Sequence, residues 1–369
     1  MVKHRGLNLR KFIASLPWDL FESYFAQLET DNKPGGWEWL NPQLAEQFLG
    51  AEENAEATAS IIEDFQRIND LGGMYVPFLL KGLTAAGIEW RDKETATAPA
   101  MRLFLQDRQA FEYSWTLFLL QATPALRSEY YFPAGDLKPS PKALEQFRAH
   151  LSGWFSVNKQ GSQCQSSVYR EDDRLLMRIA RGTTLKTYAR WKNDLVAIES
   201  FRLAAEDVLI YEPARSVLGI LGNTKRERER YIRAFATYVA GSENLAELAL
   251  NRRIFSLEPF RQGTFSYAGN GVIRRVGLIE VGLQDSSLWK GTWTLRSANV
   301  PENLAHYNIS LADVDLKRVK LQFEIQTEME TRPRIVLVDV EPPGTSDLAQ
   351  KHFQTIIENY LRQQGVKLI

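Results

Sequence analysis

Basic side chains interleaved with aromatic rings are the residues of this chain best suited to chemistry. Arg226, Arg230 and Arg233 recur at i, i+4 and i+7, so a helix would carry them in one stripe. Residues 186–192 alternate cations with aromatic rings. In nucleic-acid binding, cations neutralise phosphates and aromatic rings stack on bases. The predicted nucleic-acid-binding residues are Lys186, Arg190, Trp191, Lys192, Lys225, Arg226, Arg230, Arg233, Arg274 and Arg275.

A solvated helix face is the competing interpretation of the same arginines. Glu227 and Glu229 partly neutralise their helix, and arginine is common in exposed helical ion pairs. A contiguous surface of unpaired guanidinium groups would favour nucleic acid. Guanidinium groups that are each paired with a carboxylate would favour a solvated face or a protein interface.

Acidic residues offer a second kind of chemistry, the metal-dependent hydrolysis of phosphodiesters. Mg²⁺ prefers carboxylate oxygens as protein ligands, and nucleases hold it with acids at the ends of strands. The candidate ligands are Asp313, Asp315, Asp339 and Glu341. No predicted strand supplies the Glu-x-Lys motif that a large class of these nucleases also needs. A Mg²⁺-dependent nuclease is therefore the alternative function, whereas the first interpretation involves no metal and no other cofactor.

Histidine and cysteine give little support to other catalytic sites. The four histidines never fall three or four residues apart, so the chain has no metal-binding pair of the His-Glu-x-x-His kind. Cys164 is the single cysteine, which excludes an internal disulfide and fits a reducing compartment. We expect Cys164 to be an unreactive thiol in a loop over residues 158–167. We also expect His306 in a loop near strands.

The charge of the chain is neutral overall but uneven along its length. The 369 residues include 45 Lys and Arg against 45 Asp and Glu, so no global field attracts polyanions. Residues 151–275 carry 20 basic and 13 acidic side chains, a net charge of +7. An anionic partner is therefore expected at the middle of the chain. Because no secretory signal and no run of 18 apolar residues is present, we expect a cytoplasmic protein without a membrane partner.

The arginine stripe follows a predicted β-hairpin. Residues 208–211 and 217–221 are rich in branched apolar side chains and are separated by a turn that contains proline. Thr224 and Glu227 form a capping box, which marks the first turn of a helix. Apolar residues at helical spacing then predict a helix over residues 224–240, with Gly241 as its stop.

A helix is predicted over residues 140–154, and near residue 155 the pattern of the chain changes from helical to alternating. Strands are predicted at residues 167–169, 175–179, 272–283, 292–295, 319–325 and 335–340, followed by a closing helix from Ser346 to Gly365. The expected fold class is α+β. It comprises a helical domain over residues 1–155, a basic α+β domain over 156–255, and a β-rich domain over 256–369 that ends in the closing helix.

The helical domain is rich in tryptophan, which is enriched at the cores of protein interfaces. The residues concerned are Trp18, Trp37, Trp39, Trp90 and Trp115. We expect this domain to mediate assembly, either with a protein partner or as a homo-oligomer, although ordinary core packing explains the same residues. A purely structural subunit that binds only proteins is accordingly a third functional interpretation.

Two segments resemble uncharacterised bacterial proteins encoded in phage-defence gene clusters. They are the helix at residues 62–71, which reads IEDFQRINDL, and the hairpin and helix over residues 207–234. The resemblance implies no catalytic residues. It favours a non-catalytic accessory or sensor protein in anti-phage defence, one that contacts DNA, RNA or an acidic partner through its basic middle domain.

Overall fold

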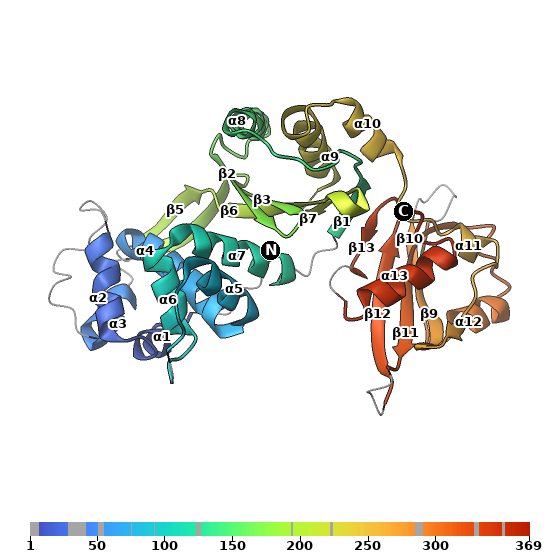
Figure 1. The fold of residues 1–369 in the computed structure, drawn as a ribbon, viewed down its shortest axis with the longest axis horizontal. Coiled ribbons are helices and arrows are strands. Elements are labelled where there is room, and N and C mark those ends of the chain that lie inside the picture. Colours follow the sequence, from blue (N-terminus) through green and yellow to red (C-terminus); the bar gives the residue numbers. More distant parts are fainter. Residues whose placement is uncertain are drawn as a thin grey trace. The chain divides into compact units, whose positions relative to one another are not determined.

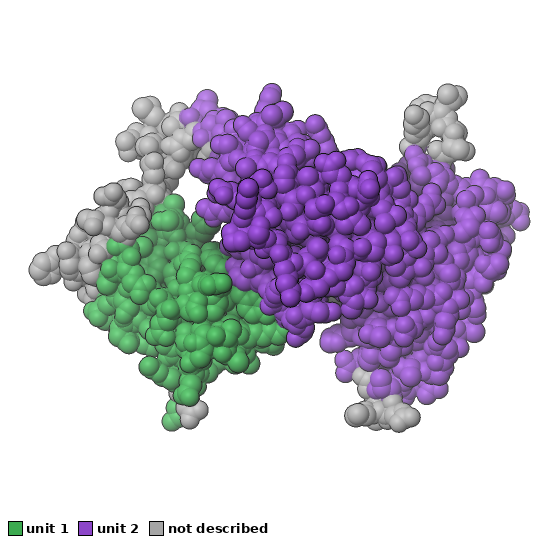
Figure 2. All heavy atoms as spheres, turned by 45° about the horizontal axis from the view of Figure 1, so that its top comes forward, with its two compact units in different colours: residues 1–124 green, residues 125–369 purple. Residues whose placement is uncertain are grey.

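The chain folds into two compact units, residues 1–124 and 125–369, which Figure 2 distinguishes by colour. The computed structural model describes residues 7–28, 42–50, 55–74, 76–91, 93–122, 127–192, 195–221, 224–284, 291–327, 332–348 and 351–369. Helices followed by an antiparallel sheet confirm the expected α+β class. The units divide between residues 124 and 125 rather than at the expected residue 155. The strand over residues 127–131 pairs within the sheet of the second unit, and the helix over residues 141–157 packs on that sheet.

The first unit is helical and has an aromatic core. Within its described residues the helices are α1 (Leu9–Ala14), α2 (Trp18–Gln27), α3 (Pro42–Gly50), α4 (Ala55–Met74), α5 (Val76–Ala86), α6 (Thr97–Gln106) and α7 (Arg108–Ala122). Phe65 of α4 packs against Phe12, Phe21 and Tyr24. Trp115 is also buried, so it contributes to packing in this unit. Trp37 and Trp39 lie outside the described residues.

An antiparallel sheet runs through the second unit (Figure 1). In the described residues its strands are β1 (Arg127–Tyr131), β2 (Cys164–Glu171), β3 (Arg174–Gly182), β6 (Ala204–Glu212), β7 (Val217–Leu221), β8 (Ala268–Asn270), β9 (Ile273–Gln284), β10 (Thr292–Arg296), β11 (Asp315–Ile325), β12 (Arg334–Glu341) and β13 (Thr345–Ser346). The order is β10-β9-β11-β12-β13-β1-β7-β6-β3-β2, and β8 pairs with β9. Strands β4 (Lys186–Lys192) and β5 (Leu195–Phe201) form a separate hairpin.

Helices cover the sheet over two separate hydrophobic cores. They are α8 (Pro141–Val157), α9 (Lys225–Ala234), α10 (Asn244–Asn251), α11 (Glu258–Arg261), α12 (Val300–His306) and α13 (Gln354–Gln363), with the short turns η4 (Pro213–Arg215) and η5 (Phe235–Val239). One core lies between α8, α9 and the strands β3, β6 and β7. The other joins α11, α12 and α13 to β9, β11 and β12. Residues 125–369 form one compact unit, and apart from Val217 the second core is built from residues after 253.

The closing helix begins later than its sequence pattern indicates. Ser346, the expected first residue, instead pairs with both Val340 and Arg127 as part of β13. Helix α13 starts at Gln354, after Phe353 adopts a left-handed backbone conformation with φ of 64°. Pairing with strands on both sides therefore overrides the local helical pattern at Ser346.

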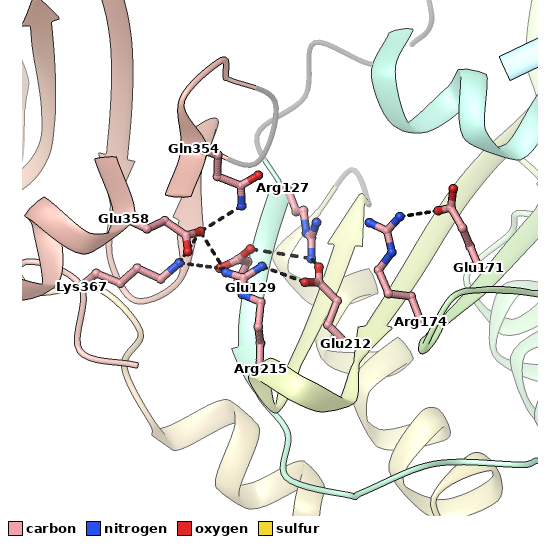
Figure 3. Close-up of polar contacts among 9 residues, drawn as sticks. All are labelled: Arg127, Glu129, Glu171, Arg174, Glu212, Arg215, Gln354, Glu358 and Lys367. Atoms are coloured by element: carbon pink, nitrogen blue, oxygen red, sulfur yellow. Dashed lines mark hydrogen bonds and ion pairs between the residues drawn. The ribbon is translucent and has the colours of Figure 1, made fainter. Parts of the chain in front are cut away.

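Strand β13 joins the two halves of the sheet, and we call it, with β12 and β1 beside it, the seam. Six buried or largely buried charged side chains lie there and form the seam network, drawn in Figure 3: Arg127, Glu129, Glu212, Arg215, Glu358 and Lys367. They come from β1, the end of β6 and the turn η4 that follows it, helix α13, and the residue Lys367 after that helix. Three are cationic and three are carboxylates, so their charges cancel.

Short contacts connect the seam network across the sheet. Arg215 Nη1 lies 2.9 Å from Glu212 Oε2, and its Nη2 lies 3.0 Å from Glu358 Oε1. Lys367 Nζ lies 2.8 Å from Glu358 Oε1. Arg127 donates a hydrogen bond to Glu212. Gly219 leaves the space for this guanidinium group, because a Cβ there would lie 2.2 Å from Arg127 Nε.

Replacing Lys367 by methionine should strongly destabilise the second unit. The substitution keeps the length of the side chain but removes a cation that is only 1% exposed. Removing one partner of a buried ion pair typically costs about 3–5 kcal/mol. Chemical denaturation of the full chain would measure the change in the free energy of unfolding.

The matched control is Lys317→Met, because Lys317 is 48% exposed and pairs with the exposed Asp315. This surface pair should contribute less than about 1 kcal/mol. An equal loss in the two variants would show that Lys367 is no more important than a surface lysine.

Glu212 should make the stability of the protein depend on acid. Burial alone would raise the pKa of Glu212, but the guanidinium groups of Arg127 and Arg215 lower it to about 2, from an ordinary value of 4.5. The unfolded chain therefore takes up the proton first, and the stabilisation is lost as the pH falls from about 4.5 to about 2. The shift corresponds to about 3 kcal/mol.

Denaturation of wild type and Glu212→Gln at several pH values tests this. We expect the variant to be less stable at neutral pH and to lose less stability on acidification. Glu258→Gln, at a half-exposed surface pair, should follow the wild-type pH profile. A Glu212→Gln profile parallel to that of wild type would contradict the prediction.

Candidate nucleic-acid interface

Helices α8 and α9 lie together on one side of strands β3, β6 and β7 (Figure 1). Helix α8 starts at Ser140, whose hydroxyl accepts a hydrogen bond from Ala143 N at 3.2 Å, and Pro141 opens its first turn. Its buried stripe consists of Phe147, Leu151 and Phe155, spaced by four residues. The sheet thus buries one side of α8, and the neighbouring side chains of the helix lie outside that core.

The predicted capping box of α9 is confirmed. Glu227 Oε2 accepts a hydrogen bond from Thr224 N at 3.0 Å, and Thr224 Oγ1 accepts one from Glu227 N at 3.1 Å. Tyr231, Ile232 and Phe235 point into the core, where they meet α8 and the sheet. After Ala234 the helix continues as the π-helical turn η5, and Gly241 follows with φ of 69°. Single π turns of this kind are frequent at functional sites.

A basic and aromatic stripe flanks the buried stripes of both helices. We call it the α8–α9 face: His150, Trp154, Arg226, Arg230, Arg233 and Tyr238. The guanidinium carbon of Arg226 lies 5.8 Å from the centre of the Trp154 ring, a cation–π contact. One turn away, Tyr238 OH and His150 Nδ1 are 3.2 Å apart. The face therefore brings together side chains from α8, α9 and η5.

The arginines of the α8–α9 face differ in how they are neutralised. Arg233 is half exposed and lies 2.5 Å from Glu247 of α10. Arg226 and Arg230 form no ion pair with any carboxylate in the part of the chain that the structure describes. Arg230 Nε is buried and lacks a hydrogen-bond partner among the described residues. Two guanidinium groups of the predicted stripe thus remain uncompensated.

Burial affects the titration of two groups on this face. Burial lowers the pKa of Arg230, and the neighbouring Arg233 lowers it further, against the opposing influence of Tyr238. Burial also lowers the pKa of His150, and the charge of Arg230 adds to this effect. His150 is therefore neutral at neutral pH, whereas an arginine stays charged because its ordinary pKa is so high.

A buried charge cluster fixes the base of α9. Arg181 of β3 contacts two carboxylates: its Nε donates to Asp207 Oδ2 at 2.7 Å and its Nη2 lies 2.9 Å from Glu227 Oε1. Tyr231 OH donates to Asp207 Oδ2 at 2.5 Å. All three charged side chains are at most 5% exposed. Because Glu227 also caps α9, this cluster sets where the helix begins on the sheet.

The other predicted nucleic-acid-binding residues lie elsewhere in the second unit. Lys225 is 85% exposed and lies 3.8 Å from Glu229. Lys186 is partly buried on β4, the strand that also carries Arg190, Trp191 and Lys192. Arg274 and Arg275 are exposed on β9, which is separated from β7 by four intervening strands across the seam. The structure thus divides the predicted set among three places rather than joining it into one surface.

The acidic residues of the nuclease interpretation do not converge. Asp339 is 11% exposed and lies 2.6 Å from Arg318 Nε and 3.2 Å from Lys320 Nζ. Asp315 pairs with Lys317 at 2.6 Å, while Asp313 and Glu341 are exposed. No group of three or more His, Cys, Asp or Glu suited to a metal ion occurs among the described residues. Two basic side chains thus neutralise the carboxylate of Asp339, which the nuclease interpretation needs as a metal ligand.

The expected loop positions of Cys164 and His306 are wrong. Cys164 is the first residue of β2 and is buried, because its side chain joins the core under α8. Burial raises the pKa of this thiol to about 11, so it is not a thiolate at neutral pH. His306 is the last residue of α12 and is exposed.

Comparisons with known protein families and with curated proteins find no match. Among the described helices, none is both long and apolar enough to cross a membrane. Because no known family matches, any function of the α8–α9 face is inferred from the positions and charges of its side chains.

Three members of the α8–α9 face were not predicted from the sequence to bind nucleic acid: His150, Trp154 and Tyr238. His150 and Trp154 are four residues apart on a correctly predicted helix, and this spacing is the one signal that could have identified them. The pairing of α8 with α9 is not visible in local patterns, since it depends on the sheet beneath both helices.

Replacing Arg181 by methionine should destabilise the base of α9. Two buried carboxylates, Asp207 and Glu227, would lose their shared cation, which typically costs about 3–5 kcal/mol. Thr224→Ala removes only the capping hydroxyl and should cost about 1 kcal/mol. Chemical denaturation of both variants gives the comparison. Equal losses would mean that Arg181 adds nothing beyond an ordinary helix cap.

Proposed function

We propose that this protein binds nucleic acid through the α8–α9 face, as a non-catalytic accessory or sensor protein. The resemblance of residues 62–71 and 207–234 to proteins of phage-defence clusters supports a role in bacterial anti-phage defence. The phosphate backbone is the proposed ligand, so binding is largely independent of sequence. The residues that carry the proposal are Arg226 and Arg230.

The single observation behind this proposal is that Arg226 and Arg230, beside an aromatic ring, have no carboxylate partner within the described ranges of the chain. Arg233, by contrast, is paired with Glu247 in the same stripe. The cation–π contact with Trp154 favours one position of the Arg226 guanidinium group, so less conformational entropy is lost when it binds an anion. An unpaired, preoriented guanidinium group is well suited to a phosphate oxygen.

The length of the stripe also suits a nucleic-acid strand. Seven residues separate Arg226 from Arg233, which corresponds to about 10 Å along a helix. One strand of a duplex carries a charge about every 3.4 Å along its axis, so the stripe spans about three phosphates. The β4–β5 hairpin, with Lys186, Arg190, Trp191 and Lys192, is a proposed second contact, while Arg274 and Arg275 lie outside this face.

The test is the affinity of the full chain for single- and double-stranded oligonucleotides, measured by fluorescence anisotropy at about 50 and about 200 mM salt. We expect Arg226→Ala and Arg230→Ala each to weaken binding about tenfold at the lower salt, because each removes a charged hydrogen bond. Each should also reduce the slope of log affinity against log salt by about 0.7–0.9.

Arg296→Ala is the matched control. It removes the same charge from β10, the last strand at the opposite end of the sheet, where Arg296 is 73% exposed. We expect wild-type affinity from this variant. Binding that is insensitive to Arg226 and Arg230 would contradict the proposal. No binding at either salt concentration, together with a stable oligomer, would favour the purely structural subunit.

A further inference from the structure

His150 occupies the centre of the α8–α9 face. It lies one helical turn before Trp154, which contacts Arg226, and its ring centre is 5.2 Å from that of Tyr238. Tyr238 OH is 3.2 Å from Nδ1. The imidazole is partly buried, so any change in its charge is felt by the neighbouring side chains.

The groups that face His150 are cationic or neutral. Arg230 of α9 is the charged group that acts on the imidazole, and η5 contributes the Tyr238 hydroxyl. On α8 itself the next member of the face is Trp154. Carboxylates that form an ion pair with His150 are absent from the described residues, and Glu247 of α10 is engaged with Arg233. A proton on His150 would therefore add a third uncompensated positive charge beside Arg226 and Arg230.

The hydrogen bond to Tyr238 does not oppose this proton. Protonation turns both ring nitrogens into donors, and a tyrosine hydroxyl accepts as well as donates. The obstacle is burial, to which repulsion from Arg230 adds, and a phosphate anion bound across the face would offset the repulsion. Phosphate and proton would thus each favour the binding of the other.

We propose that His150 takes up a proton when phosphate groups of a nucleic acid bind the α8–α9 face, so that binding tightens as the pH falls. This inference rests on the proposed function and adds a form of regulation to it. At about pH 8 the imidazole is neutral in both states and contributes no charge. At about pH 5.5 it is charged in the complex, and the affinity includes its contact with the anion.

The experiment measures the affinity of the full chain for a fluorescein-labelled oligothymidylate at about pH 5.5 and about pH 8, at constant ionic strength. We expect several-fold tighter binding at the lower pH, because a rise of one pKa unit on binding produces a ratio of at most about ten. His150→Gln should bind almost equally at the two pH values. His306→Gln, on the exposed end of α12, should keep the wild-type ratio.

A second measurement is independent of the effect of substitution on folding. The C2 proton of His150, assigned by its absence from the His150→Gln spectrum, should titrate by NMR at a higher pH when oligothymidylate is present. Equal affinities at the two pH values, or an unchanged His150 titration, would overturn the inference while leaving binding through Arg226 and Arg230 intact. Absence of binding at both pH values would contradict the proposed function, and this inference with it.

Discussion

The ion pairs of the seam network join two halves of a sheet whose strand ladder narrows to the two-residue strand β13. Strand β13 pairs with β12 on one side and β1 on the other, two residue pairs each. So short a strand ladder contributes few hydrogen bonds between the two halves. Charged side chains from β1, the turn after β6, and the C-terminal segment converge on this point. Because their charges cancel, burial is tolerated, whereas the loss of any one partner leaves an uncompensated ion in the protein interior.

The base of α9 also depends on buried charges that cancel one another, and the α8–α9 face differs from it in this respect. Arg181 is enclosed by Asp207, Glu227 and Tyr231, so its charge serves to place a helix on the sheet. On the same helix, Arg226 and Arg230 have no such enclosure among the described residues. Charge that is neutralised internally stabilises the fold. Charge that is left unpaired beside an aromatic ring is available to an external anion.

The buried acidic residues of β9 and β12 are neutralised within the fold. Asp339, the most buried of the proposed metal ligands, lies between Arg318 and Lys320, and the neighbouring Glu280 faces the same two cations. These contacts form a cross-strand ladder of opposite charges over β9, β11 and β12, which stabilises a sheet. Asp339 and Glu280 are thus neutralised by cross-strand pairing within the sheet, whereas Arg226 and Arg230 of the first half have no carboxylate partner among the described residues.

Local patterns predicted much of this protein. The hairpin of β6 and β7, the capping box of Thr224 and Glu227, and helix α8 all depend on residues close together in sequence, and all are confirmed. The arginine stripe was likewise visible from spacing alone. Which arginines are unpaired was not, because Arg233 meets Glu247 through a neighbouring helix and Arg226 meets Trp154 through α8. Ser346 was assigned to a helix for the same reason, since its strand partners lie far away in sequence. Sequence spacing determines which side chains share a face of one element, whereas only the packing of elements decides what each face meets.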